Sequence, residues 1–90
     1  MTYTQVRMDV TDYAAWRAGF DAAAPLRRNY GATGNNQFYR DHENPNTVTA
    51  ILEWEDGQRA NQYFLSPALK EAQQKAGVTK VLEMLVLERA

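Results

Sequence analysis

Residues 81–87, VLEMLVL, are apolar at six of seven positions and constrain the fold more than any other segment. In a β-strand successive side chains point to opposite faces, so a strand of this composition presents apolar side chains on both. Strands of this kind are normally covered on both faces. The fold must therefore supply a cover for each side of this strand.

Three further segments are predicted to be strands. Residues 3–10 alternate between apolar and polar side chains, as a half-buried strand does. Residues 36–41 form a second candidate, and residues 47–55 are the clearest one because of their β-branched and aromatic content. The intervening residues 42–46 are dense in turn formers, which predicts a hairpin between the second and third strands.

The first predicted helix follows the first strand. Tyr13, Trp16 and Phe20 recur at spacings of three and four, which places them on one helical face. Asp12 or the residue before it can cap the first turn. Pro25 cannot continue the helical hydrogen bonding, so the helix is predicted to end or kink near that position.

The second predicted helix begins after Asp56 and restarts at Ser66-Pro67, a capping residue followed by proline in the first turn. The resulting order is βαββαβ. With short connections and right-handed crossovers, this order predicts one α+β, ferredoxin-like domain over residues 1–90. Its four-stranded antiparallel sheet has the order 4-1-3-2, with both helices on one face.

The other face of that sheet has no cover within the chain. Bare apolar sheet on so small a domain favours association. We therefore predict a homodimer through the sheet faces, related by a two-fold axis. A monomer that exposes a few aliphatic side chains is the alternative, since such exposure is common.

The charge and residue composition of the chain limit which partners and sites can be expected. Ten basic and eleven acidic residues alternate along the chain and give a net charge of −1, so no basic patch suggests nucleic acid as a partner. The chain has no cysteine, which removes disulfides and thiolate metal sites from consideration. No signal peptide is evident and no segment approaches the roughly 18 apolar residues of a membrane span, so a cytoplasmic protein without a membrane partner is expected.

Short motifs along nearly the whole chain resemble those of the dimeric α/β-barrel superfamily, in particular its small cyclase-like and antibiotic-biosynthesis-monooxygenase-like proteins. The motifs are caps, turns and core positions, so they bear on the fold more than on the chemistry. They are Asp12-Tyr13 with Trp16 and Phe20-Asp21, Tyr39-Arg40-Asp41, Asn44-Pro45-Asn46, Leu52-Glu53-Trp54, Ser66-Pro67-Ala68-Leu69-Lys70 and Ala76-Gly77-Val78.

The resemblance implies a homodimeric α/β barrel in which two sheets face each other and each protomer holds a small-molecule pocket between sheet and helices. It implies a hydrophobic or aromatic ligand, and cofactor-independent monooxygenase-like or cyclase-like chemistry on an aromatic or polyketide-type substrate. A non-catalytic ligand-binding or stress-associated accessory protein of the same fold is the alternative. Haem-degrading members use a histidine on the second helix, which this chain lacks; no cofactor and no metal are expected.

Two residues are candidate catalysts. His42, the only histidine, lies between two carboxylates on the predicted hairpin and is a potential general base. A solvated turn is the plainer interpretation, because successive side chains point apart. Tyr63 carries a hydroxyl that needs a partner when buried and can help to stabilise a substrate anion.

Further residues are candidates for an apolar pocket with a few polar tips, the usual character of small-molecule sites. Core packing is the alternative for the aromatic ones, since the same spacing places them inside the fold. The candidate ligand-binding residues are Trp16, Tyr39, Arg40, Trp54, Asn61 and Phe64.

Arg7 and Glu53 are expected on the open face of the sheet, on neighbouring strands. A cross-strand ion pair is the plainer prediction, and contact with a ligand inside the dimer is the alternative.

Overall fold

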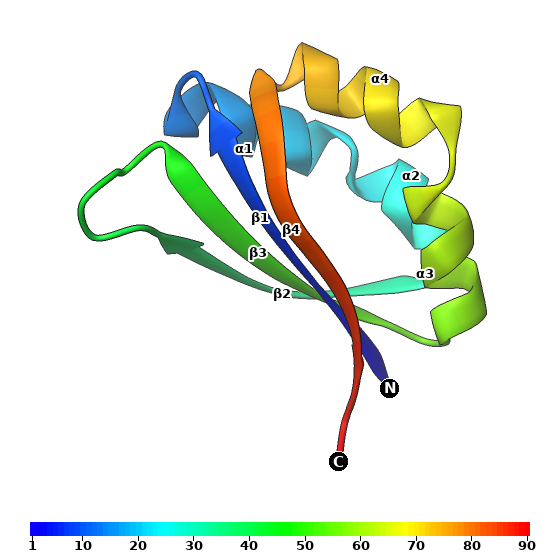
Figure 1. Ribbon diagram of the computed structural model, residues 1–90. Helices are drawn as coiled ribbons and strands as arrows, with labels where there is room; N and C mark the ends of the chain where they lie inside the picture. Colours follow the sequence, from blue (N-terminus) through cyan, green and yellow to red (C-terminus); the bar gives the residue numbers. More distant parts are fainter.

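The computed structural model describes all 90 residues and shows one twisted sheet with every helix on the same face (Figure 1). None of these helices is long and apolar enough to cross a bilayer. The elements in chain order are β1 (Thr2–Val10), α1 (Tyr13–Ala22), α2 (Ala24–Asn29), β2 (Ala32–Arg40), β3 (Thr47–Trp54), α3 (Gly57–Phe64), α4 (Pro67–Lys75) and β4 (Val78–Glu88).

The strands are antiparallel and lie in the order β2-β3-β1-β4, which is the predicted 4-1-3-2 order seen from the other edge. The fold prediction is confirmed. β1 is central and pairs with β3 on one side and β4 on the other, so the two ends of the chain meet where Thr2 pairs with Glu88 (Figure 1). The pairing of β1 with β4 contains two register irregularities.

Each predicted helix is interrupted once, so four helices cover the sheet. α1 ends at Ala22 and α2 begins at Ala24, with Pro25 in its first turn. The caps are local: Asp12 accepts a hydrogen bond from the backbone N–H of Ala15 at 2.9 Å. Ser66 caps α4 in the same way. Proline and capping side chains therefore set the helix boundaries.

Two strands begin earlier than predicted. β2 begins at Ala32, not at residue 36, because Gly34 with φ 86° lies within an irregular stretch of the strand. β4 begins at Val78, directly after Gly77. Gly77 has φ 82°, the left-handed conformation expected of a residue that ends a helix.

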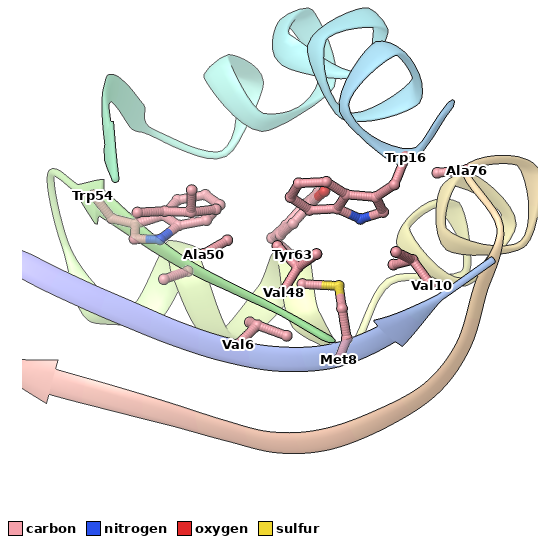
Figure 2. Close-up of a cluster of buried hydrophobic side chains, with 11 residues drawn as sticks. Val6, Met8, Val10, Trp16, Val48, Ala50, Trp54, Tyr63 and Ala76 are labelled. Atoms are coloured by element: carbon pink, nitrogen blue, oxygen red, sulfur yellow. The ribbon is translucent and has the colours of Figure 1, made fainter. Parts of the chain in front are cut away.

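The core lies between the helices and the inner strands (Figure 2). Trp54 is fully buried, and its indole N–H donates to the Thr4 hydroxyl at 2.9 Å, which satisfies the only polar atom of the ring. The buried apolar residues are Val6, Met8, Val10, Trp16, Val48, Ala50, Leu52, Trp54, Ala60, Tyr63 and Ala76. None of them belongs to β4.

β4 is bare on both faces. Met84 pairs with Val6 and so faces the helix side, whereas Leu85 pairs with Gln5 and faces the open side. The prediction that the helices cover one face therefore applies to β1 and β3 but, in this edge strand, only to its first residue, Val78, which packs against the core. The exposed apolar residues of β4 are Val81, Leu82, Met84, Leu85, Val86 and Leu87, each 37–45% exposed.

The predicted ion pair between Arg7 and Glu53 is wrong. The register pairs Glu53 with Tyr3, whose hydroxyl donates to the carboxylate at 3.0 Å. Thr33 also donates to it, at 2.9 Å, and these hydrogen bonds lower the pKa of Glu53, the one from Thr33 most. Arg7 lies instead 3.8 Å from the carboxylate of Asp41.

Candidate functional site

A cavity lies between the helix-covered face of the sheet and the helices. Its volume is about 60 Å³, and its mouth is partly open. This volume has room for several waters. Its apolar wall consists of Val6, Met8, Trp16, Phe20, Ala23, Ala50, Leu52, Tyr63, Phe64, Leu69, Ala72, Ala76 and Val78.

Three polar side chains interrupt this apolar wall: Arg27 from α2, Tyr63 from α3 and Gln73 from α4. No carboxylate and no imidazole lines the cavity. Figure 2 shows Tyr63 and Trp16 projecting into the same space above the sheet. The cavity thus combines a large apolar surface with a few convergent polar groups, the composition typical of ligand sites.

Arg27 is a buried cation without a carboxylate partner. The residue is only 5% exposed, and none of the ion pairs of the chain includes it. Its guanidinium carbon lies 3.6 Å from the centroid of the Phe20 ring, a cation–π contact. Burial lowers the pKa of Arg27, although the neighbouring Tyr63 hydroxyl and, less strongly, the Asp21 carboxylate favour its charge. The side chain remains a cation at neutral pH.

Tyr63 is held by contacts with three other aromatic rings. Its ring centroid is 5.3 Å from those of Trp54 and Phe64 and 5.5 Å from that of Tyr30. Burial raises the pKa of Tyr63, and the nearby Arg27 opposes that rise. The hydroxyl is therefore a phenol at neutral pH, a hydrogen-bond donor and not a base.

Close helix packing closes one side of the cavity. A Cβ added to Gly19 of α1 would lie 2.8 Å from the Cβ of Ala76, at the end of α4. Both residues line the cavity. The absence of a side chain at Gly19 is therefore what lets these two helix ends meet.

The structure brings together three of the residues predicted to form a site. Trp16, Tyr63 and Phe64 line the cavity. Trp54 lies behind them, with its ring centroid 5.9 Å from that of Phe64, and does not reach the cavity wall.

The other four predicted site residues lie outside the cavity and are exposed. Tyr39 is 56% exposed and pairs with Thr49, so it faces the open side of the sheet. Arg40 donates to the carbonyl of Pro45, and His42 lies in the loop after it. Asn61 lies on the outer side of α3. No three His, Asp or Glu side chains gather where they could hold a metal ion.

Arg27 was not among the predicted site residues. A signal for it is present: Trp16, Phe20, Ala23 and Arg27 are spaced by four, three and four residues, so Arg27 continues the apolar face of the first helical segment. Pro25 conceals this continuity, because it separates α1 from α2. An arginine at a core-facing position is unusual enough to mark a candidate site.

No protein-family model matches the chain, and no curated protein matches it in sequence. Solved structures do match it over almost its full length. A protein from Bordetella bronchiseptica assigned as an antibiotic biosynthesis monooxygenase has a TM-score of 0.76 and 19% identity, with 99% of this chain and 96% of that chain covered.

Two further structures agree with this match. SnoaB, a cofactor-independent oxygenase from Streptomyces nogalater, has a TM-score of 0.76 and 14% identity, covering 99% of this chain and 92% of its own. A Deinococcus radiodurans protein assigned as an antibiotic biosynthesis monooxygenase has a TM-score of 0.69 and 14% identity, with 100% and 93% covered. The chain therefore has the fold of these three proteins, the fold that the resemblance of its motifs implies.

Proposed function

We propose that the protein binds a hydrophobic, aromatic small molecule in the cavity between sheet and helices and oxygenates it without a cofactor. The observation that carries this proposal is the cavity itself, an apolar wall interrupted by the buried Tyr63 hydroxyl and Arg27 guanidinium. The fold shared with SnoaB supports the reaction class, since SnoaB is a cofactor-independent oxygenase.

The substrate supplies the electrons in such a reaction. A methylene group between two aromatic rings loses a proton, and the resulting carbanion reduces O₂. One oxygen atom enters the substrate as a carbonyl, and the other leaves as water together with the two hydrogens of the methylene group. The protein has to bind the anion, orient it and exclude water.

Tyr63 is suited to stabilise the anion. Its hydroxyl is a donor at neutral pH and points into an apolar cavity, where a hydrogen bond to an anionic oxygen is stronger than in water. The proton itself leaves to water at the mouth of the cavity, because no carboxylate or imidazole lines the wall.

The same lack of a base favours a second candidate, a non-catalytic binding protein of the same fold. The two candidates differ in whether a polar group of the cavity changes the rate of a reaction or only the affinity for a ligand.

We also propose that the working form is a homodimer through the open sheet face. The support is the exposed apolar surface of β4, which six large side chains form on both sides of one strand. A second copy that covers this strand would remove apolar surface from water on each protomer, and a two-fold axis makes the cover mutual.

The test of activity is oxygen uptake with a phenolic anthrone, a compound with a methylene group between two aromatic rings. We expect uptake of one O₂ per carbonyl formed, and a lower kcat for Tyr63→Phe at unchanged ligand affinity. Tyr39→Phe is the matched control, because Tyr39 is exposed on the open face. His42→Ala tests the predicted catalyst that lies outside the cavity.

The outcomes separate the candidates. Turnover that survives both Tyr63→Phe and His42→Ala would exclude these residues as catalysts. Ligand binding without any oxygen uptake in the wild-type protein would favour the non-catalytic binder.

A further inference from the structure

The polar groups of the cavity differ in kind from those that sequence analysis predicted. Arg27 can only donate hydrogen bonds, whereas the Tyr63 hydroxyl and the Gln73 amide can both donate and accept them. A positive charge that is 95% buried, with the Asp21 carboxylate near enough to favour it but not paired with it, is costly to keep in a small protein. A ligand that brings the missing negative charge would offset this cost.

The Arg27 guanidinium lies over the Phe20 ring, with its central carbon 3.6 Å from the ring centroid. Its N–H groups remain the donors available for hydrogen bonds to a ligand. A fork of parallel N–H groups fits the two oxygens of a carboxylate. Each guanidinium nitrogen also retains some access to the cavity or to solvent, since no fully buried side-chain nitrogen lacks a partner.

We propose that Arg27 makes the cavity selective for aromatic carboxylates, with the ring against the apolar wall and the carboxylate on the guanidinium beside the Tyr63 hydroxyl. This inference rests on the proposed function, because it needs the cavity to be a ligand site. It adds the charged group that the ligand must carry and the residue that selects it.

Size favours a small aromatic acid as the first probe. The enclosed 60 Å³ is smaller than the roughly 150 Å³ cavity that holds a benzene ring in an engineered core. A single ring therefore extends into the partly open mouth. Benzoate meets this requirement, and benzamide is its neutral counterpart of nearly the same shape.

The chain contains its own reporter pair. One of its two tryptophans, Trp16, lines the cavity. The other, Trp54, lies behind the cavity wall, and its indole N–H donates a hydrogen bond to the Thr4 hydroxyl. Titration of the ¹⁵N-labelled protein with benzoate at pH 7 should shift the Trp16 indole signal much more than the Trp54 signal. The titration curve gives the Kd.

We expect benzoate to bind the wild-type protein about 10- to 100-fold more tightly than benzamide, the range of a hydrogen-bonded charge pair. Arg27→Met should reduce the affinity for benzoate to that for benzamide and leave the latter nearly unchanged. Phenol, neutral at pH 7, should behave like benzamide. Arg28→Met, on the exposed side of α2, is the matched control and should keep the selectivity.

Equal affinity of the wild-type protein for benzoate and benzamide, with Trp16 shifted by both, would overturn the selectivity and leave the proposed ligand site standing. Failure of all three probes to shift Trp16 would overturn both. The wild-type comparison needs no variant, so it remains decisive even if Arg27→Met does not fold.

Discussion

Arg27→Met should make the ligand-free protein more stable. The guanidinium is buried without a carboxylate, and burial lowers its pKa, which means that its surroundings favour the charged form less than water does. Methionine keeps most of the volume of the side chain and fills irregular space well. The substitution therefore removes a buried charge and keeps the packing.

The magnitude follows from three contributions. Desolvating a guanidinium costs several kcal/mol in a real protein. The cation–π contact with Phe20 returns about 0.5–2 kcal/mol, and the interaction with the Tyr63 hydroxyl about 1.5–3 kcal/mol. Replacing buried charges by apolar side chains of similar volume is often neutral or stabilises a protein by about 1–4 kcal/mol, and because of the two favourable contacts we expect the lower part of this range, a gain of about 1–2 kcal/mol in the free energy of unfolding. For a domain of this size it corresponds to a rise in Tm of about 4–8 °C for each kcal/mol.

Urea denaturation of both proteins at one fixed concentration measures this difference, because a dimer makes apparent stability depend on concentration. The m-value should not change. Arg28→Met, an exposed neighbour on α2, should alter the free energy of unfolding by less than about 0.5 kcal/mol. A loss of about 1 kcal/mol or more in Arg27→Met would refute the reasoning and identify Arg27 as a structural residue.

Three further measurements follow from the structure. Leu85→Glu should reduce the mass found by light scattering from that of two chains to that of one. Leu65→Glu is the control and should not change the mass, because Leu65 is 84% exposed and lies between α3 and α4, away from the sheet. A monomeric wild-type protein would contradict the proposed dimer. Tyr63 should be the last of the five tyrosines to ionise in an alkaline absorbance titration, and Tyr63→Phe should remove that last step. Because its folded pKa is raised, its contribution to stability is complete below about pH 10 and is lost as the pH rises through the folded pKa, so a protein that becomes more stable there would contradict the assignment. Gly19→Ala should lower the free energy of unfolding by about 1–3 kcal/mol, since the new Cβ would meet Ala76 at 2.8 Å; an unchanged urea midpoint would show that α1 and α4 can separate freely.

The features predictable from sequence are those decided by local chemistry. Asp12, Ser66 and Gly77 act through backbone groups within a few residues of themselves, so the helix ends lie where the sequence predicts them. The order of elements then leaves few topologies, which is why the sheet order was predictable.

The features that sequence analysis missed depend on neighbours distant in the chain. The early start of β2 depends on how β3 pairs across the irregular stretch at Gly34. The register alone decides that Tyr39 faces the open side of the sheet. Arg27 became a cavity residue because α2 continues the buried face of α1 beyond Pro25. Pairing and packing of this kind leave little trace in a local pattern.

The pairing of the first strand with the last has a consequence for synthesis on the ribosome. β1 is an inner strand, yet β4, its partner on one side, consists of residues 78–88 and is synthesised after β1, β2 and β3. Until then the nascent chain carries a sheet with β1 as an unprotected edge, and such edges recruit other strands. β4 therefore completes the sheet, and a chain that stops before Val78 would expose the edge of β1 and be prone to aggregate.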